Sequence, residues 1–202
     1  MKRAPAAITP DWPVAALAGA GLAISLYLTL TKLAGATALL CHRGGGCDVV
    51  QSSRYATFLG LPTAAWGAGL YLVVGAVALA GLTARRWLWA FLLAVVGASF
   101  SAFLTFVELA ILRAVCFYCL TAAVLALALL AVVLARRPHS TERRGWGAPR
   151  RLATLGATAA VVTIALGVVG DLTGSGVPAT AYQEGLARHL AQTGAVFYGA
   201  YW

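Results

Sequence analysis

Long apolar stretches separated by short charged segments run along most of the chain. Five of these stretches contain no Asp, Glu, Lys or Arg, and each has about the 20 residues that an α-helix needs to cross a lipid bilayer, or more. The pattern therefore predicts five transmembrane helices, at residues 13–31, 61–83, 87–107, 114–135 and 152–170.

The ends of the first two helices follow from sequence details. The second apolar stretch is longer than one span, so we place residues 55–60 outside the helix and Pro62 in its first turn, where proline is tolerated. The first stretch follows Lys2 and Arg3, as a signal sequence would. Its apolar run is longer than the apolar core of a signal sequence, which has about 7–15 residues, so we expect a retained helix.

The composition excludes an ordinary soluble domain. Of the 202 residues, 61% are hydrophobic and 10% are charged, and the mean hydropathy is +0.84. Soluble domains have about 25% charged residues. A soluble domain of this size could not bury so much apolar surface, and a disordered chain would be far more polar. We therefore predict an all-α integral membrane protein.

The basic residues indicate how the chain is oriented. If the N-terminus is cytoplasmic, ten of the 15 Lys and Arg residues lie on the cytoplasmic side, as the positive-inside rule requires. These ten are Lys2, Arg3, Arg85, Arg86, Arg136, Arg137, Arg143, Arg144, Arg150 and Arg151. The net charge of +9 then fits contact with anionic membrane lipid and gives no reason to expect a nucleic-acid partner.

The same orientation places all four cysteines on the non-cytoplasmic side, which is oxidising in bacteria and in the secretory pathway. Cys116 and Cys119 form a C-x-x-C motif at the start of the fourth predicted helix, so their thiols share a face. The helix N-terminus and Arg113 favour a thiolate there. These features favour a redox pair, and the alternative is two cysteines that merely pack in the membrane.

Cys41 and Cys47 form the other pair and enclose three glycines. Glycine permits backbone angles that other residues avoid, so this loop can close a disulfide and also reopen to direct Cys47 elsewhere. The alternative is a disulfide that only staples the loop. Five residues separate the two cysteines, whereas structural zinc sites usually have about 2–4, so we expect no metal.

The segment after Cys47 predicts a short helix. Asp48 and Gln51 have the spacing of a capping box, which would start a helix at Asp48 over the mouth of the bundle. Ser52 or Ser53 would then face the interior, or each would bond the local backbone.

These residues together resemble a known family. Residues 47–56 read Cys-Asp-Val-Val-x-Ser-Ser-Arg-Tyr-Ala, Cys41 precedes them, and Gly60-x-Pro62, Gly67 and the C-x-x-C motif follow. This arrangement, over about residues 13–135, resembles vitamin K epoxide reductase and its bacterial homologues.

The resemblance implies a four-helix transmembrane bundle around a quinone site, with a fifth transmembrane helix in many bacterial members. It implies that Cys116 and Cys119 are the active-site pair, with Cys119 nearest the quinone, and that Cys41 and Cys47 are the shuttle pair. Ser53 matches the position whose hydroxyl is implicated at the quinone. The quinone would be ubiquinone, menaquinone or phylloquinone.

The resemblance also implies a function. Bacterial members oxidise a thioredoxin-like protein or fused domain and reduce a quinone, which supports disulfide bond formation, with the cysteines on the periplasmic side of the inner membrane. One alternative is an animal-type reductase of vitamin K epoxide. The other is a membrane scaffold without enzymatic activity, whose cysteines only staple loops.

The expected organisation has five parts. They are a cytoplasmic tail (1–12), a four-helix catalytic bundle (13–135) with an external loop (31–60), a cytoplasmic basic loop (136–151), a fifth transmembrane helix (152–170) and an external segment (171–202). Residues 196–202 resemble the strand that leads into a thioredoxin-like active site. We therefore expect residues 171–202 to be a linker and the start of a truncated thioredoxin-like domain.

Overall fold

The computed structural model is almost entirely helical, as predicted. It describes residues 9–36, 38–39, 41, 45–137, 149–173, 188–190 and 192–193. The long helices are α1 (Trp12–Leu33), α3 (Thr63–Leu79), α4 (Ala84–Phe106), α5 (Phe117–Ala135) and α7 (Pro149–Thr173). The short elements are α2 (Gly46–Ser52), the 3₁₀ turn η1 (Arg54–Ala56), the paired strands β1 (Thr57–Phe58) and β2 (Leu61–Pro62), and the π-helical segment η2 (Val107–Ile111).

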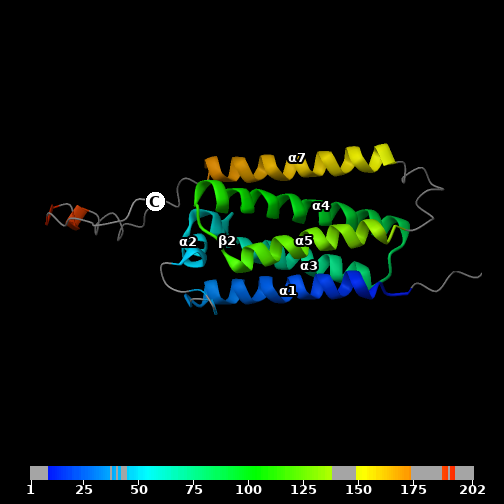
Figure 1. Ribbon diagram of the computed structural model, residues 1–202, viewed down its shortest axis with the longest axis horizontal. Coiled ribbons are helices and arrows are strands. Elements are labelled where there is room, and N and C mark those ends of the chain that lie inside the picture. Colours follow the sequence, from blue (N-terminus) through cyan, green and yellow to red (C-terminus); the bar gives the residue numbers. More distant parts are fainter. Residues whose placement is uncertain are drawn as a thin grey trace, which may run out of the picture.

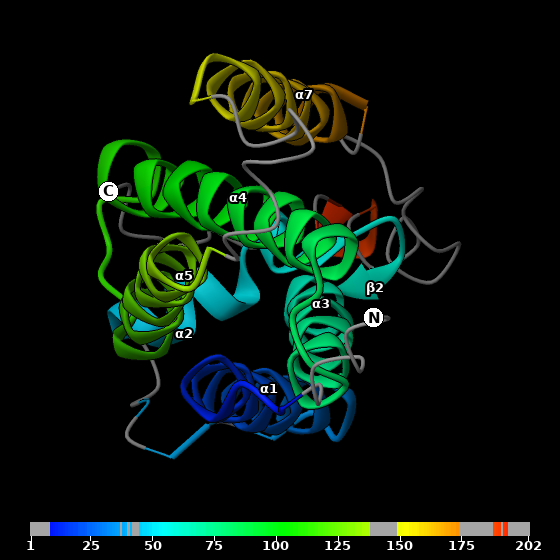
Figure 2. The same ribbon diagram turned by 90° about the vertical axis from the view of Figure 1, so that its right-hand side faces the viewer.

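Four of the long helices form a bundle, and the fifth lies outside it. α1, α3, α4 and α5 surround a common interior, with α2 across one end, while α7 packs along α4 (Figures 1 and 2). This arrangement agrees with the predicted four-helix bundle plus one further helix. Most of the expected loop at 136–151 and of the expected segment at 171–202 falls outside the described residues.

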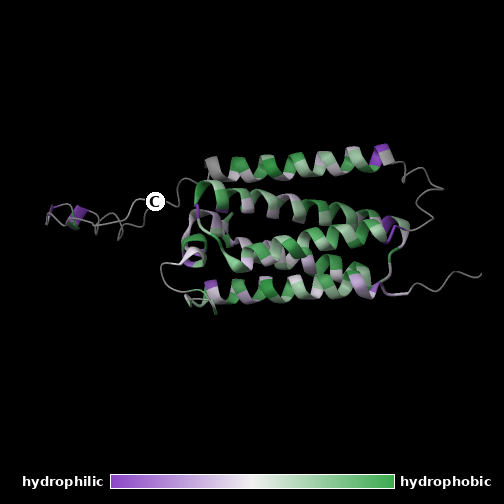
Figure 3. Ribbon diagram, in the orientation of Figure 1, coloured by the Kyte–Doolittle hydropathy of each residue, from purple (hydrophilic) through white to green (hydrophobic). Residues whose placement is uncertain are grey.

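Within the described part of the chain, four helical segments are long and apolar enough to cross a membrane: Trp12–Leu33, Ala84–Ile111, Phe117–Ala135 and Arg150–Gly170. The span predicted at 61–83 instead forms α3, which has 17 residues. Its start is fixed by Pro62, which is extended and precedes the first turn, and Gly81, with φ of +83°, lies just beyond its end. Apolar residues cover the helices, and polar residues gather at their ends (Figure 3).

The core at the end of the bundle opposite α2 is built around Trp87. This side chain is fully buried, stacks on Phe91 with 5.6 Å between ring centroids, and donates its indole N–H to the Val133 carbonyl at 2.7 Å. Because the bond joins α4 to α5, Trp87 fixes these two helices against each other.

Candidate active site

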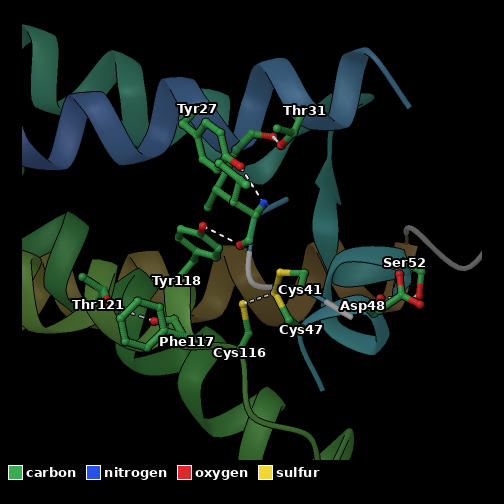
Figure 4. Close-up of a disulfide and its surroundings, with 12 residues drawn as sticks. Tyr27, Thr31, Cys41, Cys47, Asp48, Ser52, Cys116, Phe117, Tyr118 and Thr121 are labelled. Atoms are coloured by element: carbon green, nitrogen blue, oxygen red, sulfur yellow. Dashed lines mark hydrogen bonds between the residues drawn. A yellow bond between two sulfur atoms is a disulfide. The ribbon is translucent and has the colours of Figure 1, made fainter. Parts of the chain in front are cut away.

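The first cysteine pair is a disulfide at one end of the bundle. Cys41 and Cys47 are bonded, with 5.4 Å between their Cα atoms (Figure 4). Cys41 is partly exposed, whereas Cys47 is buried in the first turn of α2. Residues 42–44 lie outside the described residues, so the predicted flexibility of this loop stays a prediction.

Two tyrosines hold the chain that leads to Cys41. The Leu39 N–H donates to the Tyr27 hydroxyl at 2.7 Å, and the Tyr118 hydroxyl donates to the Leu39 carbonyl at 2.6 Å (Figure 4). Tyr27 belongs to α1 and Tyr118 lies within the C-x-x-C motif on α5. Tyr118 of the C-x-x-C motif thus helps to hold the loop of the first cysteine pair, and the two cysteines of the same motif form the second pair.

The second pair consists of free thiols at the start of α5. Cys116 precedes the first turn of the helix and is fully buried, and Cys119 is partly exposed within that turn. A hydrogen bond from the Cys119 thiol lowers the pKa of Cys116 to about 7, although burial and the carboxylate of Glu108 oppose this change. A large share of Cys116 is therefore thiolate at neutral pH, and the thiolate is the reactive form of cysteine.

The two pairs meet at their inner cysteines. The sulfur of Cys116 lies 3.7 Å from that of Cys47 (Figure 4). This approach depends on Gly46, because a Cβ atom there would lie 2.6 Å from the Val115 carbonyl oxygen. The missing side chain lets α2 rest against the backbone that precedes Cys116.

Glu108 is a buried carboxyl group beside the second pair. It is 1% exposed, and one of its oxygens accepts a hydrogen bond from the Cys116 N–H. The π-helical segment η2 and a tight turn, in which Arg113 has φ of +48°, return the chain so that the Ala114 N–H donates to the Glu108 carbonyl. This backbone path places Cys116 over the Glu108 side chain.

A cavity of about 330 Å³ opens beside these residues within the bundle. Cys119 and Glu108 line it, together with mainly apolar residues of α1, α3, α4, α5 and α7. Its polar lining residues include Lys32, Gln51 and Tyr55. A largely apolar pocket of this size with a few polar groups is typical of a small-molecule site.

Comparison with known protein families matches residues 12–134, well over half of the chain, to the model of the vitamin K epoxide reductase family. The chain belongs to this family. The resemblance inferred from the sequence is therefore confirmed. Family membership identifies the protein as a membrane oxidoreductase and supports a role for its cysteines in disulfide chemistry.

The vitamin K epoxide reductase match does not test the role predicted for Ser53. Its hydroxyl donates to the Val50 carbonyl at 2.7 Å, and the residue is not among those that line the cavity. The Ser52 hydroxyl likewise bonds the backbone, at the Asp48 carbonyl. The role of Ser53 at the quinone stays a prediction.

The predicted capping box at Asp48 is wrong. α2 begins at Gly46, with Gly45 before its first turn and no side chain capping it. Gly46 stands at the first position because α2 must approach Val115 closely. Asp48 instead lies in the first turn, where its negative charge complements the helix dipole.

Sequence reasoning missed the place of Glu108 in the site. Its position at the end of an apolar stretch indicates only a charge at the membrane boundary. The structure shows no ion pair on Glu108 among the described residues. The sequence did hold one signal that could have placed Glu108 in the site, namely that it lies close to the C-x-x-C motif along the chain. Carboxyl groups at membrane depth find polar partners.

Three donor atoms of the site could hold a metal ion. One carboxylate oxygen of Glu108 and the sulfurs of Cys116 and Cys119 all lie within 4.8 Å of one another. Thiolates and a carboxylate suit Zn²⁺, but such binding would occupy the same thiols that disulfide chemistry requires. We therefore assign these sulfurs to redox chemistry.

Proposed function

We propose that this protein is a quinone-dependent thiol–disulfide oxidoreductase that supports disulfide bond formation. In this proposal, electrons pass from a thioredoxin-like dithiol protein to Cys41 and Cys47, then to Cys116 and Cys119, and finally to a quinone. The observation that carries the proposal is the 3.7 Å contact between the sulfurs of Cys47 and Cys116.

Exposure favours Cys41 as the point of entry. It is the more exposed member of the disulfide, so the partner's thiolate attacks its sulfur and Cys47 leaves. The released Cys47 thiolate is already beside Cys116. No large movement of α2 is needed before the next exchange.

The second exchange transfers the electrons to the C-x-x-C pair. Cys47 attacks Cys116 in an oxidised Cys116–Cys119 disulfide, which forms a Cys47–Cys116 bond and releases Cys119. The second partner thiol frees Cys41, which then attacks Cys47, restores the first disulfide and releases Cys116. A low pKa makes Cys116 a good leaving group in this last step.

The cavity suits a quinone as the final electron acceptor. When bound, a quinone takes up two electrons from the reduced pair and, with two protons, becomes quinol. The apolar walls would hold its ring and tail, and polar side chains of the lining, including Lys32 and Tyr55, would orient its oxygens. Cys119 lines the cavity and Cys116 does not, which supports Cys119 as the cysteine that faces the quinone.

We place the protein in the bacterial inner membrane, and the charge distribution supports an orientation with the cysteines on the periplasmic side. Arg85 and Arg86 lie in the first turn of α4, and Arg136 and Arg137 follow α5, at the end of the bundle opposite α2. By the positive-inside rule, that end is cytoplasmic.

Quinone reduction by the purified protein tests the proposal. The protein in nanodiscs is given a small dithiol, and the loss of ubiquinone or menaquinone is followed by absorbance. The same assay is run on Cys119→Ala and on the control Thr121→Ala. Thr121 is a partly exposed residue of the same helix that does not line the cavity. We expect loss of quinone with the parent and Thr121→Ala, and none above background with Cys119→Ala. Equal rates in all three would refute the assignment. Faster turnover of vitamin K epoxide than of either quinone would favour the animal-type activity.

A further inference from the structure

The buried carboxyl group of Glu108 lies where protons move when the second pair is oxidised. Its carboxylate and the sulfurs of Cys116 and Cys119 lie within 4.8 Å of one another. Glu108 also lines the cavity, and it supplies the only carboxyl group among the described residues that do so. The side chain therefore borders both the dithiol and the space assigned to the electron acceptor.

The fold holds this carboxyl group in place without a cation. Among the described residues, the side chain of Glu108 has one hydrogen bond, from the Cys116 N–H, and no ion pair. The π-helical turn is closed by a bond of 2.9 Å from the Leu112 N–H to the Val107 carbonyl. Such π-helical turns occur frequently at functional sites. A carboxyl group that is not paired with a cation is able to take up and release a proton.

Oxidation of the dithiol requires a path for protons. The reaction forms one S–S bond between Cys116 and Cys119 and passes two electrons to the quinone, which takes up two protons as it becomes quinol. When Cys116 is a thiolate, the pair supplies one of these protons, that of the Cys119 thiol, and the other comes from the solvent. The proton that must move is that of Cys119, which lines the cavity. A group on the cavity side of the pair that accepts and donates protons can carry it to the quinone.

We propose that Glu108 carries a proton from the Cys116–Cys119 pair to the quinone, an inference that rests on the proposed function. The carboxylate accepts the proton of the Cys119 thiol as the S–S bond forms, and the resulting carboxyl group donates it to the nearer quinone oxygen. The hydrogen bond from the Cys116 N–H keeps the carboxyl group against the pair throughout.

Glu108→Gln separates proton transfer from simple positioning. The amide oxygen still accepts the hydrogen bond from Cys116 and the side chain keeps its size, but it no longer exchanges protons at this site. The control is Leu109→Ala, a change at an exposed side chain in the same π-helical segment that does not line the cavity.

The first readout needs no quinone. Infrared difference spectra of the protein in nanodiscs are recorded between the states in which Cys116 and Cys119 are chemically reduced and oxidised. We expect a change in the carboxyl C=O band in the parent and in Leu109→Ala, and its loss in Glu108→Gln. A band change that persists in Glu108→Gln, or its absence in the parent, would overturn the proposal.

The second readout is single-turnover oxidation of the prereduced pair by a quinone. We expect Glu108→Gln to be about 100-fold slower than the parent, the usual effect of losing a proton-transfer group. Exchange between Cys47 and Cys116, followed by quenching with an alkylating reagent, should keep its rate. Equal slowing of both steps would show a positioning role and overturn the proposal. If the parent itself does not reduce quinone, the proposed function fails, and the infrared readout still decides whether Glu108 exchanges a proton with the pair.

Discussion

Replacing Gly46 by alanine should separate the two cysteine pairs. A Cβ atom at this position would lie 2.6 Å from the carbonyl oxygen and 2.8 Å from the nitrogen of Val115. Both are backbone atoms and cannot rotate away. An ordinary contact of at least 3.4 Å requires α2 and this segment to move apart by about 0.8 Å. The separation of the Cys47 and Cys116 sulfurs would then grow from 3.7 Å to about 4.5 Å.

A displacement of this size should slow the exchange strongly. Misplacing reacting groups by about 1 Å can reduce a rate by about 100-fold. We therefore expect transfer of electrons from Cys47 to the oxidised Cys116–Cys119 pair to be slowed by about 30- to 100-fold in Gly46→Ala. The assay adds a small dithiol, quenches with an alkylating reagent at intervals, and follows the redox state of Cys116 and Cys119 by mass spectrometry.

Gly19→Ala is the matched control, since a Cβ atom there would meet nothing within 4 Å. It should exchange at the parent rate. Helical content and melting temperature should be checked for both variants, so that unfolding is not mistaken for slow exchange. A folded Gly46→Ala variant that exchanges as fast as the parent would refute the reasoning.

Two further predictions concern the reactive thiol and the core. In the reduced protein, alkylation of Cys116 should rise with pH around a midpoint near 7, because deprotonation yields the reactive thiolate. Cys119→Ala removes the hydrogen bond that lowers this pKa and should move the midpoint to higher pH, and an unchanged midpoint would contradict the assignment. Trp87→Phe removes the hydrogen bond to Val133 and should destabilise the bundle by about 1 kcal/mol, read as a lower melting temperature in detergent. The control Trp89→Phe changes an exposed side chain, and an equal effect there would contradict the role given to Trp87.

The sequence predicts the features of this protein that depend on local spacing. Apolar stretches between charges locate the long helices, because crossing a bilayer sets a minimum length. The spacing of Cys116 and Cys119 predicts that the two thiols lie close together, and their sulfurs lie within 4.8 Å of each other, although Cys116 precedes the helix instead of forming part of it. These inferences need no knowledge of how the helices pack.

Features that depend on packing lay beyond the sequence. The contact between Cys47 and Cys116 arises because Gly46 lets α2 rest on Val115, and these residues are far apart in the chain. Glu108 becomes part of the site only because a π-helical turn and the positive φ of Arg113 fold Cys116 back over it. No periodicity of apolar residues predicts that Cys47 lies beside Cys116 or that Cys116 lies over Glu108.

The most direct test of the relay is to trap the bond between Cys47 and Cys116. In Cys41→Ser, Cys47 is free to attack an oxidised Cys116–Cys119 pair, and no Cys41 thiol is present to attack Cys47 and break the resulting bond. Protein isolated from membranes under acid quench, alkylated, digested and mapped by mass spectrometry should contain a Cys47–Cys116 disulfide and an alkylated Cys119. The Cys41→Ser, Cys47→Ser variant should lack that bond. A Cys116–Cys119 disulfide that stays intact beside a free Cys47 thiol would contradict the relay.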